Sequence, residues 1–550
     1  MTTFYIQNIS MGKDSFEVLL NTLTRRFGER GCELCNAQDA DYTFRLDKDP
    51  ELSSDSYIIV PDGKEISFTA ANDCALHAAV GRFLYDSRFD GIGGFEPSAE
   101  KVDFTPAKPL RGMYFATHFH NFYHEAPVSE VYEVIEDLAL RGCNALLVWY
   151  DMHHYTSIDQ PESVALISRL KLFLKYAKKI GMSASLTMLA NEGFDSSPEQ
   201  LRATFLVENG YHTKPYGIYN REICPSKPGG IEEILRERRQ VLEAFSDVNI
   251  DFVCYWPYDQ GGCTCEKCTP WGSNGFLRIL PHFQKLLAEV CPGCKLIISA
   301  WYFDRFIDGE WEAFMKKIRS GEVSGFDYIM SFFFNGELPE CIRRDGIPEG
   351  VRFIDFPEIS MYSCTPWGGF GANPLGRFLD RTNMGSGHLY RGGFPYSEGI
   401  FEDINKYMIL SYYSGRHLIS HDAVKQYARF ELCCDDTALV DAIERTETAL
   451  ARKGSIADGV RRFQISDTSD IEYVYNTLTE YDGRLPERIR RTPRWRMLYL
   501  RAVIDHELAA NGFALSNSER GTEALRELYG IYHCTPQTHR WVCPPLEQKT

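Results

Sequence analysis

The chain has 550 residues, of which 44% are hydrophobic and 25% charged, a balance typical of a soluble globular protein of about two to four domains. Lys and Arg number 59 against 76 Asp and Glu, and the formal net charge of -17 argues against a nucleic-acid partner, whose binding surface needs a basic excess. No apolar run reaches the roughly 18–20 residues that span a bilayer, so we expect no membrane partner either.

The 17 cysteines are an odd number, and the amino terminus lacks the basic and apolar segments of a secretory signal. Both observations favour a reducing, cytoplasmic compartment over a disulfide framework. Aromatic residues make up 13% of the chain, enough for a large core and for a site that stacks on sugar faces. The sequence leaves open whether the chain forms a homo-oligomer.

Residues 1–109 predict a small α/β domain. Phe4–Asn8 alternates as a strand does, and apolar residues over 16–27 recur at helical spacing. Three more strands are expected at 42–46, 57–60 and 65–69, followed by a helix over 76–84. The predicted order is therefore β-α-β-β-β-α.

Over residues 110–425 the pattern changes to a repeat of one strand followed by one helix. Eight such units over about 300 residues predict a (β/α)₈ TIM barrel. An open doubly wound sheet is the alternative, and it is less favoured because no Gly-rich phosphate loop follows the first strand. The expected strands are Gly112–Phe115, Ala145–Trp149, Ser183–Met188, Phe252–Trp256, Leu296–Trp301, Tyr328–Phe332, Arg352–Phe356 and Gly387–Tyr390.

Residues 426–550 show helical periodicity at 438–451, 471–478 and 494–508, which predicts a helical C-terminal domain.

The active groups of a TIM barrel come from the carboxyl ends of its strands, so residues there are the candidates. Aromatic rings suit sugar faces, and polar groups suit hydroxyls. The His-rich run 117–124 could suggest a metal, but contacts to substrate hydroxyls are the favoured interpretation. The predicted substrate contacts are His118, His120, Trp149, Tyr150, Asp151, Tyr258, Trp301, Tyr302, Trp367, Arg391 and Tyr396.

Three carboxylates are the catalytic candidates. Cleavage of a glycosidic bond needs one carboxylic acid for the leaving oxygen and a second carboxylate on the other face of the sugar. Asp259, within the segment Trp256–Gly262, is the predicted general acid, and Glu398 or Glu358 its partner, with Glu192 in reserve. The alternatives are structural: Asp259 could order a Gly-rich turn, and Glu398 could compensate the dipole of the helix that follows it.

Three cysteines lie within six residues, at Cys263, Cys265 and Cys268. Thiols at this density in a reducing compartment predict a structural zinc site, with Cys224 as the fourth ligand. Unligated, reduced cysteines are the alternative. No organic cofactor is expected.

A small α/β domain before a barrel, with the segment Trp256–Gly262 and its cysteines, resembles glycoside hydrolase family 20, the β-N-acetylhexosaminidases, and its relatives in families 67, 84 and 163. The resemblance implies an exo-acting glycosidase for small oligosaccharides. Family 20 has adjacent Asp and Glu after the fourth strand, where this chain has Asp259 and Gln260. This departure keeps two alternatives open: an inverting uronidase like the family 67 α-glucuronidases, with Arg305 or Arg391 pairing the substrate carboxylate, and a non-catalytic sugar-binding barrel.

Overall fold

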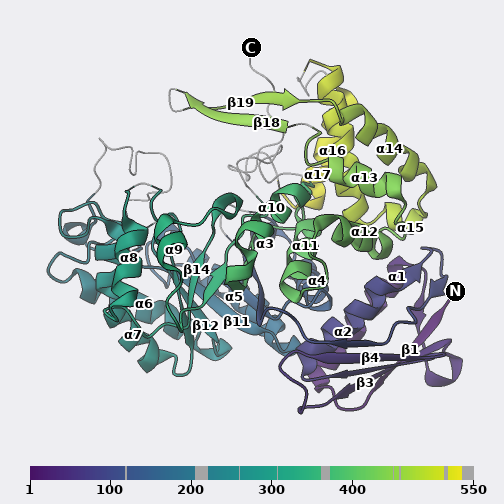
Figure 1. Ribbon diagram of the computed structural model, residues 1–550, viewed down its shortest axis with the longest axis horizontal. Helices are drawn as coiled ribbons and strands as arrows, with labels where there is room; N and C mark the ends of the chain where they lie inside the picture. The colour runs from purple at the N-terminus through teal and green to yellow at the C-terminus, as the bar shows by residue number, and fades with distance from the viewer. Residues whose placement is uncertain are drawn as a thin grey trace.

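The computed structural model describes residues 1–117, 121–204, 221–258, 261–305, 307–360, 372–449, 451–457, 460–512 and 518–534, with the backbone alone over 451–466. Figure 1 shows three regions: the purple N-terminal sheet with its helices, the teal and green barrel, and the yellow-green helices near the C-terminus. Among the described helices, none is long and apolar enough to cross a membrane.

The N-terminal region is a six-stranded sheet in the order β2-β1-β3-β5-β4-β8, with α1 and α2 packed against it. The predicted order is confirmed, and the additional strands have only two or three residues, too few for a periodic pattern. The elements are β1 Thr3–Asn8, α1 Lys13–Glu29, β2 Glu33–Leu34, β3 Tyr42–Lys48, β4 Tyr57–Asp62, β5 Glu65–Ala70, α2 Asp73–Asp86, β6 Arg88–Phe89, β7 Phe95–Glu96 and β8 Val102–Phe104.

The barrel is closed, as predicted. Eight parallel strands follow one another around the ring, and pairing of β10 with β9 completes it. A short strand, β17 Tyr396–Ser397, adds to the carboxyl half of β9. The eight strands are β9 Leu110–Phe115, β10 Ala145–Trp149, β11 Ser183–Leu189, β12 Phe252–Trp256, β13 Lys295–Ser299, β14 Tyr328–Ser331, β15 Phe353–Asp355 and β16 Tyr390–Gly393.

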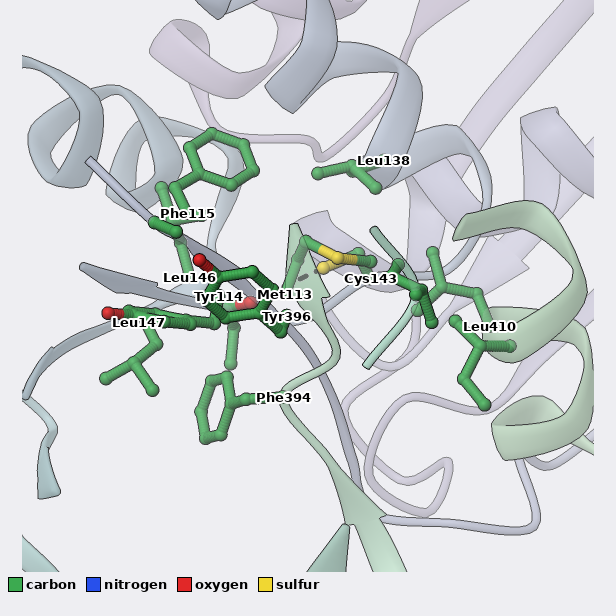
Figure 2. Packing of buried hydrophobic residues seen from close by; sticks show 14 of the residues in the cluster. Met113, Tyr114, Phe115, Leu138, Cys143, Leu146, Leu147, Phe394, Tyr396 and Leu410 are labelled. Carbon is green, nitrogen blue, oxygen red and sulfur yellow. Dashed lines mark hydrogen bonds between the residues drawn. The ribbon is translucent and has the colours of Figure 1, made fainter. Parts of the chain in front are cut away.

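The first two barrel strands are largely hydrophobic and buried along their whole length, as expected of a parallel sheet that is covered on both faces. Figure 2 shows part of this packing, with Tyr114 and Phe115 of β9 beside Leu146 and Leu147 of β10, and Tyr396 close to them. The rings of Tyr114 and Tyr396 lie 5.7 Å apart.

Helices surround the barrel and continue into the C-terminal region. The barrel helices are α3 Phe122–Glu125, α4 Val128–Leu140, α5 Pro161–Ile180, α6 Gly230–Ala244, α7 Phe276–Val290, α8 Glu310–Arg319, α9 Glu340–Asp345, α10 Gly376–Ser386 and α11 Asp403–Ser414. The C-terminal region comprises α12 Ser420–Glu431, α13 Thr437–Arg445, β18 Ala451–Ala457, β19 Val460–Asp467, α14 Ile471–Arg484, α15 Glu487–Arg490, α16 Pro493–Ala510 and α17 Glu519–Ile531.

The β18–β19 hairpin was not predicted. Its strands are antiparallel and follow α13 directly, whereas the expected helix ran on to residue 451. The sequence does contain a hairpin signal there, Asp458-Gly459, a pair typical of two-residue turns.

A buried network of charges joins the three regions. Glu431 of α12 contacts Arg26 and Arg30 of α1, and it also contacts Arg141 after α4, at 2.9 Å. Arg494 of α16 reaches Asp403 of α11 at 2.9 Å. Because these groups are largely buried, each charge depends on its partners for stability.

Candidate active site at the barrel mouth

Glu398 follows β17 at the carboxyl end of the barrel strands and is fully buried. The hydroxyl of Tyr396 donates a hydrogen bond to Oε1 of Glu398 at 2.8 Å. Its other oxygen, Oε2, has no hydrogen-bond partner among the described residues. Burial and then repulsion from Glu358 raise the pKa of Glu398 well above its usual value. An unsatisfied buried carboxyl at a strand end is typical of a functional group, because a purely structural one would be paired.

Glu358 lies beside it on the neighbouring segment. It follows β15, and its backbone pairs with that of Tyr396 in a parallel bridge. Oε1 of Glu358 accepts the amide hydrogen of Ser360 at 2.8 Å, a bond that favours the charged carboxylate. The structure thus brings together two of the predicted catalytic carboxyls, and their proximity favours a state with one proton between them.

Glu402, and not Glu398, has the structural role at the start of the helix that follows. Oε1 of Glu402, directly before α11, accepts hydrogen bonds from the Ser397 hydroxyl and from the amides of Glu398 and Gly399, at 2.6, 2.6 and 2.9 Å. Glu402 therefore orders this turn, and the Glu398 side chain is not needed for it. Glu402 was not among the predicted residues, although an acidic residue directly before a helix is a recognisable signal.

The Glu398 turn packs against the C-terminal region. Tyr532, just after α17, stacks on Phe401 with ring centroids 4.3 Å apart. A Cβ atom at Gly399 would lie 2.5 Å from Cβ of Phe122 and 2.8 Å from the Tyr532 ring, so only glycine fits at this position.

Aromatic rings gather at the ends of β12, β13 and β15. The ring of Trp256 lies 5.9 Å from that of Trp301 and 4.7 Å from that of Phe356. Directly after Trp301, Tyr302 has a left-handed backbone with φ of 62°, as has Asn335 after β14 with φ of 55°. Such strained non-glycine residues cluster at functional sites. Of the predicted aromatic contacts, Trp301 and Tyr302 belong to this group.

A second polar group follows β10 and β11. Nδ1 of His153 contacts Oε1 of Glu192, and Nδ1 of His154 lies 2.7 Å from Oδ2 of Asp151. Burial raises the pKa of Glu192 to about 8 and lowers that of His153 well below its usual value. Asp151 thus lies in a buried polar cluster next to Trp149, the last residue of β10.

Three of the predicted substrate contacts do not face the barrel mouth. The Tyr150 hydroxyl bonds Ser163 of α5 at 2.6 Å, and the Tyr258 hydroxyl donates to Glu310 of α8 at 2.5 Å. Both rings are turned into the protein, so they support loops and do not present a face to a ligand. The prediction for Arg391 was wrong because β16 begins at Tyr390, which places the exposed Arg391 inside the strand. Its charge there acts on Lys108, next to the amino end of β9.

Five residues of the predicted site and its surroundings lie outside the described residues, and their roles stay predictions. They are His118, His120, Asp259, Gln260 and Trp367.

The four cysteines do come together. The Sγ atoms of Cys224, Cys263, Cys265 and Cys268 all lie within 4.8 Å of one another. Cys224 comes from the loop between β11 and α6, and the other three come from the loop between β12 and α7. The structure therefore brings the four predicted thiols together, and the metal stays a prediction.

No family model matches the chain, and no curated protein matches it in sequence. Solved structures do match. A family 20 β-N-acetylhexosaminidase from Streptomyces coelicolor is 12% identical with a TM-score of 0.53, over 78% of this chain and 92% of its own. A family 138 enzyme targeting pectin rhamnogalacturonan II is 11% identical with a TM-score of 0.55, over 99% and 77%.

A family 89 protein from Clostridium perfringens, solved with GlcNAc-alpha-1,4-galactose, is 12% identical with a TM-score of 0.57, over 94% of this chain and 65% of its own. These likenesses show the fold alone, and that fold is the one that the resemblance to family 20 implies. The chain therefore shares its fold with these glycoside hydrolases.

Proposed function

We propose that the protein is an exo-acting glycoside hydrolase for small oligosaccharides, and that a terminal N-acetylhexosamine is its leading substrate. The observation that carries the proposal is the Glu398–Glu358 pair, with an unpartnered Oε2 on a buried Glu398 among the described residues. The solved neighbours whose descriptions name N-acetylglucosamine or its hexosaminidases support the substrate class.

The pair places a carboxyl that favours its protonated form beside a second carboxyl at the barrel mouth. Burial and the Glu358 charge disfavour the ionised form of Glu398 and hold its pKa well above the usual value, which favours the protonated carboxyl. Glu358 would act as the carboxylate that stabilises positive charge at the anomeric carbon, as a nucleophile or through a water molecule. Asp259, predicted after β12, would approach the sugar from across the ring as the general acid.

Two carboxyls beside each other make participation by the substrate's acetamido group unnecessary, in keeping with Gln260 in place of an acid. The uronidase alternative needs an arginine to pair the substrate carboxylate. One of its two candidates, Arg391, lies within β16 and is therefore not available for this role. A non-catalytic sugar-binding barrel would gain nothing from a buried, unsatisfied carboxyl, which costs stability.

The test is hydrolysis of a panel of 4-nitrophenyl glycosides by the purified protein. The panel includes both anomers of the N-acetylglucosaminide, N-acetylgalactosaminide, glucoside, galactoside and glucuronide. We expect release of nitrophenol from an N-acetylhexosaminide. Release from the glucuronide alone would favour the uronidase, and binding of a sugar without release from any member would favour the binding protein.

A further inference from the structure

We propose that Cys224, Cys263, Cys265 and Cys268 bind one zinc ion, as a structural tetrathiolate site that clamps two loops of the barrel mouth. Sγ of Cys224 lies 3.8 Å from that of Cys265 and 3.9 Å from that of Cys268. Four sulfurs bound tetrahedrally at about 2.3 Å from zinc stand about 3.8 Å apart, so the spacing is that of a single ion. The distances are nearly twice the roughly 2.05 Å of a disulfide bond.

The surroundings fit a closed site. Cys224, Cys263 and Cys268 are at most 1% exposed, and Cys265 is half-buried. All four positions would be filled by protein sulfur, which leaves no open position for water or substrate. Such a site stabilises structure and supplies no Lewis acid to the reaction.

The backbone and a neighbouring hydroxyl prepare the ligands. The amides of Cys268 and Thr269 both donate to the carbonyl of Cys265, at 2.9 and 3.0 Å, and this turn brings the sulfurs of Cys265 and Cys268 to one side. The Ser226 hydroxyl lies 3.0 Å from Sγ of Cys224 and 3.2 Å from Sγ of Cys265, where it can donate to thiolates. Hydrogen bonds of this kind orient metal ligands.

The site complements other links between the same two loops. Nδ2 of Asn191 donates to the carbonyls of Ile223 and Gly262, at 3.0 and 2.7 Å, next to a cysteine in each loop. The beginning and end of the second loop are tied by Trp271, whose indole donates to the carbonyl of Pro257 at 2.6 Å. The ion would secure Cys263, Cys265 and Cys268 between these anchors.

The chain contains a natural control. Cys291 and Cys294 form another Cys-x-x-Cys, with the amide of Cys294 bonded to the carbonyl of Cys291 at 3.1 Å. In the described part of the chain, no group of three metal-ligating side chains includes them. The Cys-x-x-Cys spacing therefore does not make a metal site by itself, and the two added thiols, Cys224 and Cys263, distinguish the proposed site.

The experiment is elemental analysis of the full-length protein after purification without added metal, for wild type, Cys265→Ser and Cys294→Ser. We expect about one zinc per chain in wild type and Cys294→Ser, and loss of most of it in Cys265→Ser. Because Cys265→Ser could misfold, wild-type protein is also stripped with a chelator and titrated with Co²⁺. We expect one equivalent to produce the visible absorption of tetrahedral cobalt thiolate, with zinc displacing it.

Three results would overturn the proposal: wild type without metal and with four reactive thiols at this site, iron in place of zinc, or equal loss of zinc in Cys294→Ser. These readouts are independent of glycosidase activity, so they remain valid if the proposed reaction is wrong.

Discussion

The hydroxyl of Tyr532 donates a hydrogen bond of 2.7 Å to the backbone carbonyl of Glu398, across 134 residues of sequence. The end of the C-terminal helices thereby contacts the turn that holds the central carboxyl of the proposed site. Tyr532 is a positioning residue, because it acts on the backbone of Glu398 and has no role in the chemistry itself.

Replacement Tyr532→Phe removes this bond and keeps the ring that stacks on Phe401. We expect kcat to fall up to about tenfold with little change in KM, since one neutral hydrogen bond contributes about 0.5–1.5 kcal/mol. The matched control is Tyr475→Phe, which removes a C-terminal tyrosine hydroxyl bonded to Arg520. Equal kinetics for wild type and Tyr532→Phe would show that the turn holds its geometry without the bond.

The two candidate acids, Asp259 and Glu398, can be separated by leaving group. A general acid matters most when the departing oxygen is basic, so its loss should cost about 10² or more in kcat on a disaccharide and much less on a 4-nitrophenyl glycoside. We expect this pattern for Asp259→Asn. For Glu398→Gln we expect similar losses on both substrates. If the leaving-group pattern appeared in Glu398→Gln and not in Asp259→Asn, Glu398 would be the general acid.

Stability should depend on pH through Glu398. Its pKa is raised in the folded protein, so the native state binds a proton that the unfolded chain releases above about pH 4.5. The free energy of unfolding should therefore fall as pH rises from the unfolded value through the folded one.

Glu398→Gln should remove this part of the decline, and Glu358→Gln should reduce it by removing the neighbouring charge. Urea unfolding at several pH values measures the effect. Identical pH profiles for all three proteins would contradict the proposed coupling.

For the buried charge network we predict the opposite dependence of stability on pH. Although burial alone would raise the pKa of Glu431, the guanidinium groups of Arg26, Arg494 and Arg141 hold it well below its usual range. Its stabilising contribution is present above about pH 4.5 and is lost as pH falls through the lower folded value. Glu431→Gln should cost about 3–5 kcal/mol near neutral pH, because it leaves buried arginines without a partner.

Glu237→Gln is the control for this loss. Glu237 is equally buried, but burial raises its pKa to about 7, so its replacement should not weaken the protein at neutral pH. If both variants lost the same stability, the network would have no special role.

The sequence predicts the barrel well because its strands are buried apolar runs bounded by turns. The eighth strand was predicted three residues too early, because two of its four residues, Gly392 and Gly393, give no hydrophobic signal. That displacement also produced the wrong placement of Arg391.

The position of a residue after a strand was predictable, whereas the direction of its side chain was not. Tyr150 and Tyr258 have the expected positions, but their hydroxyls bond Ser163 and Glu310 in the surrounding helices. Tyr532 could not be found from sequence at all, because its role depends on packing between distant segments.

The most direct test of the proposed function is the rate of nitrophenol release by wild type and Glu358→Gln on the aryl glycoside that the panel identifies. In the proposed mechanism Glu358 is the carboxylate that assists at the anomeric carbon, so its replacement by the amide should lower kcat by about 10² or more while the folded state, followed by circular dichroism, is unchanged. Turnover by folded Glu358→Gln at the wild-type rate would contradict the assignment of this carboxylate pair as the catalytic centre.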